Sequence, residues 1–211
     1  VAWGRKATTV PGIASDSYEV SVHNAATVSG EGTNLAGEAR DTLVVDAAEQ
    51  QIQLTDAPYA QLALARVNSM AGCLQAVLDL GLQFAAERSQ FGRSISKFQA
   101  IQHALAVVAA EVAASQRAAD AGVDAMGSDR FEQEVAAAKA RVGEAVGIVA
   151  EQVHQVHGAM GITEDTPLGS MYRHARAARI YDGPDEVHVA SASRRILRSF
   201  KAGDGWDFGL R

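Results

Sequence analysis

The residue best placed to do chemistry is Asp182, an acid between a tyrosine and a Gly-Pro step in the segment RIYDGPDEVHVAS. Pro184 is typical of the first position of a helix, and the two acids after it suit the positive end of the helix dipole. Asp182 therefore lies just outside a predicted helix, where an aspartate can cap the chain end. Gly183 can already occupy the cap position, so the second interpretation is that Asp182 is a base that accepts a proton.

A second group of candidate residues lies in the segment AERSQFGRSISKFQAIQ, residues 86–102. This segment joins two predicted helices through a Gly-containing turn and carries Arg88, Arg93 and Lys97. A helix that begins near Ser96 beside these cations suits an anion such as a phosphate, because its N–H groups and its dipole favour negative charge. The alternative is a helix–helix corner whose charges are solvated.

Two histidines three residues apart, His154 and His157, could share one helix face as metal ligands do. No third ligand with suitable spacing accompanies them, so we expect no metal site. Gly158 and Gly161 follow. We expect these glycines to end the helix and to let another molecule approach the backbone closely.

A mainly helical chain must position these residues. The N-terminal quarter carries short alternating runs of β-branched residues, which predict a few strands. Alanine- and leucine-rich segments at helical period predict helices at 58–87, 96–125, 130–157, 167–178 and 184–200. Short connections between long helices favour antiparallel neighbours. We therefore predict a β-rich segment at 1–55, an antiparallel bundle of four or five helices at 56–201 and a tail at 202–211.

The composition limits the classes of partner. The chain has 211 residues and a net charge of −6, so its surface as a whole offers no positive field for nucleic acid. The single cysteine, Cys73, excludes an internal disulfide and suits a reducing compartment. We find no apolar run long enough to cross a bilayer and no secretory leader, so we expect a cytoplasmic protein without a membrane partner.

Taken together, these segments resemble the C-terminal helical domain of the acyl-CoA dehydrogenase family. The run RSQFGRSISKFQAIQ is similar to the family's Arg-x-x-Phe-Gly turn followed by Phe-Gln-Ala-Ile-Gln. The run QVHGAMGITEDTPLGSMYRHARAARIYDGPDEVH is similar to its Gln-x-x-Gly-x-x-Gly stretch, which ends in a Tyr-acid-Gly motif. The resemblance covers about residues 57–200, and the motifs keep the family's order and spacing.

The resemblance implies an FAD site shared between subunits. The residues that match contacts to a neighbour's FAD are Arg88, Gln90 and Phe91 for the pyrophosphate, Ile95, Phe98 and Gln99 for the adenosine, and Gln155, Val156, Gly158 and Ala159 through a backbone-rich segment. The residues that match contacts to the flavin of the chain's own site are Pro184 and Glu186.

The resemblance also implies a role for Asp182, which matches the position of the family's catalytic base. That base, more commonly glutamate, removes the α-proton of an acyl-CoA thioester while the β-hydrogen leaves as hydride to the flavin. The version YDGPDEV resembles the subgroup that uses aspartate. Tyr181 and Gly183, which flank the base, are the expected substrate-binding residues.

The chain departs from the family pattern in two respects. About 55 residues precede the helical region, fewer than the two domains that family members usually carry there. An arginine that the family often places nine residues before Gly72 is replaced by Ala63, and Arg66 lies one helical turn along. Both departures bear on whether this chain alone turns over substrate.

Three functions remain open at this point. The first is an FAD-dependent acyl-CoA dehydrogenase, seen as a fragment or as a short subunit that completes its site with a partner. The second is a catalytically silent subunit that serves assembly, and the third is a helical interaction domain without a cofactor. The first implies an acyl-CoA substrate, a homo- or hetero-oligomer built through the helical domain, and an electron-transfer flavoprotein as a partner.

Overall fold

A computed structural model describes residues 4–13, 18–24, 26–34, 36–54 and 56–202 of the chain. Internal contacts divide the chain into two units, Val1–Gln61 and Leu62–Arg211, and each is described by itself. All but the first residue of the predicted tail at 202–211 lies outside the described residues.

The N-terminal unit contains two small antiparallel sheets, so the predicted β-rich character of this region is confirmed. A three-stranded sheet has the order β1-β2-β5, and β3 pairs with β4. A short 3-10 turn precedes the first strand. The elements are η1 (Gly4–Lys6), β1 (Val10–Ile13), β2 (Glu19–His23), β3 (Ala26–Gly30), β4 (Thr42–Val45) and β5 (Gln50–Gln53).

An ion pair between Arg5 and a buried aspartate, Asp41, fixes the first turn of this unit. Arg5 Nη2 lies 2.5 Å from Oδ1 of Asp41, whose side chain is fully buried. The hydrogen bonds from Arg5 hold the pKa of the Asp41 carboxyl at about 2, because they stabilise its charged form. Asp41 is therefore a structural acid that ties the N-terminal turn to the segment before β4.

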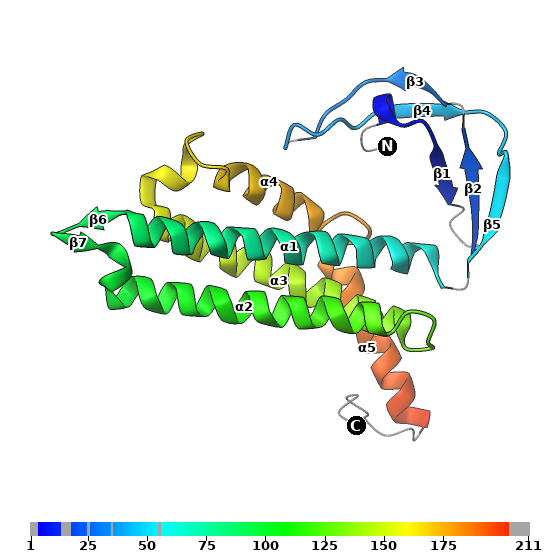
Figure 1. Ribbon diagram of the computed structural model, residues 1–211. Helices are drawn as coiled ribbons and strands as arrows, with labels where there is room; N and C mark the ends of the chain where they lie inside the picture. Colours follow the sequence, from blue (N-terminus) through cyan, green and yellow to red (C-terminus); the bar gives the residue numbers. More distant parts are fainter. Residues whose placement is uncertain (1–3, 14–17, 25, 35, 55, 203–211) are drawn as a thin grey trace. The chain divides into compact units, whose positions relative to one another are not determined.

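The C-terminal unit is a bundle in which each of the three long helices runs antiparallel to the next one along the chain (Figure 1). The helices are α1 (Pro58–Glu87), α2 (Gln99–Asp124), α3 (Phe131–His157), α4 (Leu168–Ala178) and α5 (Asp185–Ala202). The shorter elements between them are β6 (Ser89–Gln90), β7 (Arg93–Ser94), η2 (Ile95–Lys97) and η3 (Gly158–Ile162). All five predicted helices are present, and the predicted mainly α fold is confirmed.

The start of α2 differs from the prediction. A 3-10 turn occupies residues 95–97, and α2 begins only at Gln99. Ser94 accepts the hydrogen bond from the backbone N–H of Ser96 at 3.3 Å, and Phe98 precedes α2 without a side-chain cap. The prediction that the helix begins at Ser96 is therefore wrong by three residues, because the chain tightens into a 3-10 turn before the α-helix begins.

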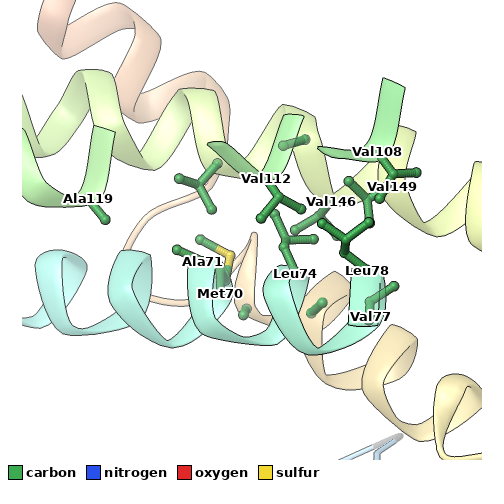
Figure 2. Close-up of a cluster of buried hydrophobic side chains, with 14 of the residues drawn as sticks. Met70, Ala71, Leu74, Val77, Leu78, Val108, Val112, Ala119, Val146 and Val149 are labelled. Atoms are coloured by element: carbon green, nitrogen blue, oxygen red, sulfur yellow. The ribbon is translucent and has the colours of Figure 1, made fainter. Parts of the chain in front are cut away.

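The core of the bundle lies where α1, α2 and α3 meet. Figure 2 shows Met70 and Leu74 of α1 together with Val112 of α2 and Val146 of α3, and all four side chains are buried. The spacing of four residues between Met70 and Leu74 places both on one face of α1. Leu62, which the sequence places near the same face, is 41% exposed and lies outside this cluster.

One expectation about membranes needs correction. By length and composition, α1 is apolar enough to cross a bilayer, whereas the sequence analysis found no such run. This is weak support for a membrane span, because buried core helices meet the same criteria. Val67, Met70 and Leu74 of α1 lie in the core of the helical unit.

Candidate functional site

Asp182 lies in the turn between α4 and α5, and its backbone adopts a left-handed conformation with φ of 59°. Aspartate and asparagine tolerate this region better than other residues with a Cβ. The carboxylate is not used as a helix cap. Instead, Oδ2 of Asp182 accepts a hydrogen bond from Nε of Arg66 on α1 at 3.0 Å. The interpretation of Asp182 as a helix cap is therefore wrong, because its carboxylate pairs with Arg66.

The backbone on both sides of Asp182 is held by Lys139, a fully buried lysine on α3. Its Nζ donates to the carbonyl oxygen of Arg179 at 2.8 Å and to that of Gly183 at 3.1 Å. It also lies 3.7 Å from Oδ1 of Asp185. Burial lowers the pKa of Lys139, and the nearby carboxylates oppose this effect. A single ammonium group thus fixes the turn from the inside.

Asp185, the first residue of α5, completes this network. Its Oδ2 accepts a hydrogen bond from Nε of Arg179 at 2.7 Å, and Nη2 of Arg179 forms an ion pair with the same oxygen at 2.7 Å. A Cβ atom at Gly143 of α3 would overlap the Asp185 carboxylate, so the glycine makes room for the buried acid. The end of α4 and the start of α5 are therefore tied to each other and to α3.

His188 holds the turn from its outer side. Its Nε2 lies 2.9 Å from the carbonyl oxygen of Asp182, to which it donates. Gly183 has φ of 96°, and a Cβ atom there would lie 2.8 Å from Nε2 of His188. Glycine is therefore required at position 183 both for its backbone conformation and for the approach of the imidazole.

A pocket of about 560 Å³ lies at the other end of α1, beside the β6–β7 hairpin. Nine of the twelve residues expected to contact FAD line it. They are Arg88, Gln90, Phe91, Ile95, Phe98, Gln155, Val156, Gly158 and Ala159. Phe84, Ala100, Ile101, His157 and Met160 complete the lining. Segments that are more than fifty residues apart in the sequence therefore meet at one concave surface.

Local backbone geometry builds this pocket. Phe91 has φ of 51° and Gly92 has φ of 76°, so the hairpin turns tightly and leaves the Phe91 ring 89% exposed. The Phe91 and Phe98 rings meet edge to face, with centroids 6.1 Å apart. Gly158 ends α3 with φ of 58° and ψ of −138°, as the sequence predicts for a terminating glycine. The result is an exposed aromatic wall opposite a helix end.

Three expected FAD contacts lie away from the pocket lining. Gln99 is the exposed first residue of α2. Pro184 directly precedes α5 and Glu186 is its second residue, both close to Asp182 in the sequence. Arg88, which lines the pocket, directly follows α1, whereas Arg66, the partner of Asp182, lies in the N-terminal third of α1. At a rise of 1.5 Å per residue these two positions are roughly 33 Å apart along the helix.

The two histidines considered as metal ligands each form a hydrogen bond with a backbone carbonyl group of their own helix, α3. Nδ1 of His154 donates to the carbonyl oxygen of Ala150 at 2.7 Å, and Nδ1 of His157 to that of Val153 at 2.9 Å. The His157 ring stacks on Phe84 with centroids 4.2 Å apart. Within the described part of the chain, no three His, Cys, Asp or Glu residues form a group suited to a metal ion.

The buried histidines predict a pH dependence of stability. Burial lowers the pKa of His157 and of His188 below 6.5. Between 6.5 and these lower values the unfolded chain binds protons that the folded chain does not, so the free energy of unfolding falls as the pH falls. Each such proton contributes a slope of up to about 1.4 kcal/mol per pH unit.

Urea unfolding of wild type and of His157→Gln, on both sides of pH 6.5, measures this effect. In the variant, the free energy of unfolding should change less steeply with pH, and the ring stacking on Phe84 is also lost. An unchanged slope would show that His157 is protonated alike in both states. His103→Gln, at an exposed position on α2, is the matched control.

Two residues at the Asp182 turn were missed or undervalued by the sequence analysis. Arg66 was noted only as one helical turn from an expected arginine, yet it is the partner of Asp182. Lys139 was not singled out, although it falls between Val135 and Val142 on the apolar face of α3. A lysine at a buried position of an amphipathic helix is a usable signal, because such a charge needs a partner.

The helical region matches a family model described as the acyl-CoA dehydrogenase C-terminal domain, over residues 56–197. The chain is 32% identical over 132 residues to the mitochondrial short-chain specific acyl-CoA dehydrogenase of Bos taurus, covering 62% of this chain and 32% of the bovine protein. It is 32% identical over 129 residues to the acryloyl-CoA reductase (NADH) of Anaerotignum propionicum, covering 60% of this chain and 32% of that protein. The matched segment is thus about a third of either relative.

The fold is also similar to solved structures. The butyryl-CoA dehydrogenase of Megasphaera elsdenii aligns with a TM-score of 0.76, covering 93% of this chain and 58% of that chain. The sequence identity in this alignment is 17%, so the likeness shows the fold alone.

Proposed function

Because this chain belongs to the acyl-CoA dehydrogenase family, whose C-terminal domain it carries at residues 56–197, we propose that it is the helical part of an FAD-dependent acyl-CoA dehydrogenase. Such an enzyme removes the α-proton of an acyl-CoA and transfers the β-hydrogen as hydride. The chain works either as a piece of a longer protein or as a short subunit that completes its site with a partner. A cytoplasmic location and an electron-transfer flavoprotein as the electron acceptor belong to the same proposal.

The observation that carries this proposal is the pocket beside the β6–β7 hairpin. It gathers expected FAD contacts from two distant segments, around residues 88–98 and 155–159, although they were selected by motif alone. Its volume of about 560 Å³ lies in the range of small-molecule sites. A helix–helix corner with solvated charges would not require these motifs to share one concave surface.

The residues of the pocket fit one end of an FAD molecule. Arg88 is exposed, and its guanidinium has no ion pair within the described residues, so it is available to a phosphate. Phe91 is exposed and offers an aromatic face to a planar ring, whereas the Arg93 guanidinium lies over the Phe98 ring, 4.2 Å from its centre. Gly158 lacks a side chain where the backbone lines the pocket, and a Cβ there would meet nothing within 4 Å. Bound FAD would supply the hydride acceptor of the reaction.

The proposed role of Asp182 is to take the α-proton of the acyl-CoA. The turn offers a carboxylate with 20% exposure and a backbone fixed from two sides by Lys139 and His188. A fixed base contributes because the proton must be transferred in one geometry. An acyl chain that excludes water from the turn would strengthen the carboxylate as a base. Tyr181 and Gly183, on either side of Asp182, are the proposed substrate contacts.

The separation of the pocket and the turn supports a shared site. They lie at opposite ends of the helical bundle, roughly 33 Å apart along α1. One chain would therefore bind the FAD of a neighbouring subunit through the pocket and serve its own flavin through Asp182, Pro184 and Glu186. We propose a homo- or hetero-oligomer built through the helical unit, and experiments on activity should use this assembly with any chain that co-purifies.

The catalytically silent assembly subunit remains the second candidate, because Arg66 already occupies one oxygen of Asp182. Anaerobic mixing of the flavin-loaded assembly with acyl-CoA separates the two functions. Bleaching of the flavin absorbance supports the dehydrogenase. Retained flavin without bleaching by any acyl-CoA supports the silent subunit.

Replacing Arg88 by alanine should weaken flavin retention more than folding. A charge-assisted hydrogen bond to phosphate contributes about 1.5–3 kcal/mol, which corresponds to roughly a 10- to 150-fold loss of affinity. An exposed arginine contributes little to stability. Flavin content per chain and melting temperature should be measured on the same preparations.

The matched control is Arg117→Ala, which removes an arginine with a 73% exposed side chain from α2. It should leave both flavin content and melting temperature close to wild type. Equal flavin content in Arg88→Ala and Arg117→Ala would remove Arg88 from the proposed cofactor site.

A further inference from the structure

Arg66 contacts the two residues at the centre of the proposed chemistry. Its Nε donates to Oδ2 of Asp182 at 3.0 Å, and its guanidinium carbon lies 5.2 Å from the centre of the Tyr181 ring. Oδ1 of Asp182 has no hydrogen bond to any residue that the structure describes. One carboxylate oxygen is therefore held, and the other is available to a substrate.

The position of Arg66 on α1 explains why it can reach the turn. Ala63, one turn earlier, is fully buried in the bundle, where a guanidinium would be costly to desolvate. Arg66 lies on the same helix at a partly exposed position, with 32% of its side chain accessible to solvent. An arginine at position 66 can thus contact Asp182 without entering the core.

We propose that Arg66 is a positioning residue that orients the Asp182 carboxylate for proton abstraction, an inference that rests on the proposed function. An aspartate is one methylene shorter than a glutamate, so its carboxylate has less freedom to find the substrate. A directed N–H···O contact with one oxygen fixes the orientation of the other. The Tyr181 ring in turn restrains the guanidinium from its other side.

This role predicts a specific defect in Arg66→Gln. Loss of orientation should lower the limiting rate of flavin reduction by acyl-CoA about 100-fold, because misplacement of a reacting group by 1 Å has an effect of this order. Flavin content and the apparent affinity for acyl-CoA should stay near wild type.

The experiment compares wild type, Arg66→Gln, Arg66→Lys and the control Arg117→Gln in the flavin-loaded assembly. Flavin bleaching is followed anaerobically over a range of acyl-CoA concentrations, so that the limiting rate and the apparent affinity are obtained separately. Arg66→Lys keeps an N–H donor on a long side chain but lacks the planar guanidinium group, so it should recover only part of the rate. Arg117→Gln should match wild type.

A limiting reduction rate for Arg66→Gln equal to that of wild type would overturn the inference while leaving the proposed function intact. A wild type that acyl-CoA does not bleach would overturn the proposed function and this inference with it. The ion pair itself is tested without flavin by urea unfolding of Arg66→Gln, Asp182→Asn and the double variant. Shifts of the unfolding midpoint that do not add are expected, and additive shifts would contradict the pairing.

Discussion

Replacing Asp182 by asparagine is expected to lower the rate of flavin reduction by acyl-CoA about 10²- to 10⁴-fold, the usual contribution of a positioned base. The fold should persist, because asparagine tolerates the left-handed backbone at this position almost as well as aspartate. The lost ion pair with Arg66 is partly exposed, so its loss should cost only about 0.2–1 kcal/mol, too little to unfold the chain. Bleaching rate, flavin content and melting temperature together separate a chemical defect from a structural one.

The matched control for this change is Asp165→Asn, which neutralises an exposed acid in the segment before α4. It should bleach at the wild-type rate. If Asp182→Asn also bleaches at that rate, Asp182 is not the base, and Glu186 at the start of α5 becomes the nearest acid to test.

Replacing Lys139 by methionine is expected to destabilise the helical unit by about 2–4 kcal/mol. The change leaves the carbonyl oxygens of Arg179 and Gly183 without their donor, and each such loss costs about 1–3 kcal/mol. Asp185 keeps its bonds to Arg179 but loses the nearby ammonium. Because the same two carbonyls flank Asp182, the variant should also lose flavin reduction at temperatures where it remains folded.

Urea unfolding and anaerobic bleaching measure the two effects of Lys139→Met separately. Lys201→Met, at the exposed C-terminal end of α5, is the control and should be neutral in both. A variant as stable as wild type would show that the buried ammonium is not needed to hold the turn. A destabilised variant that still bleaches at the wild-type rate would separate the stability of the turn from its chemistry.

The helical part of the fold could be predicted from the sequence because its elements carry strong local signals. Apolar residues at helical period define α1, which is rich in alanine and leucine, and α3, which is rich in alanine and valine. Gly158 ends α3 where expected. The start of α2 was placed three residues early, since nothing local distinguishes a 3-10 turn at 95–97 from the first turn of the helix. Such boundaries depend on how the hairpin closes against its neighbours.

The candidate site could be predicted only where a motif was contiguous. The residues around the β6–β7 hairpin and the end of α3 were chosen from two runs of sequence, and the fold brings nine of them to one pocket. Their role in binding FAD stays a prediction. The partners of Asp182 could not be found in this way, because Arg66 lies 116 positions away in the sequence and Lys139 acts through backbone carbonyls. Such contacts depend on helix packing.

Exchange of the α-proton of acyl-CoA with deuterated water tests the central claim most directly. Proton abstraction by Asp182 predicts that the flavin-loaded assembly incorporates deuterium at Cα, and that Asp182→Asn does so at least about 100-fold more slowly. The Asp165→Asn control should exchange at the wild-type rate. Equal incorporation by Asp182→Asn, or none by a wild-type assembly that retains its flavin and binds acyl-CoA, would contradict the assignment of Asp182 as the base.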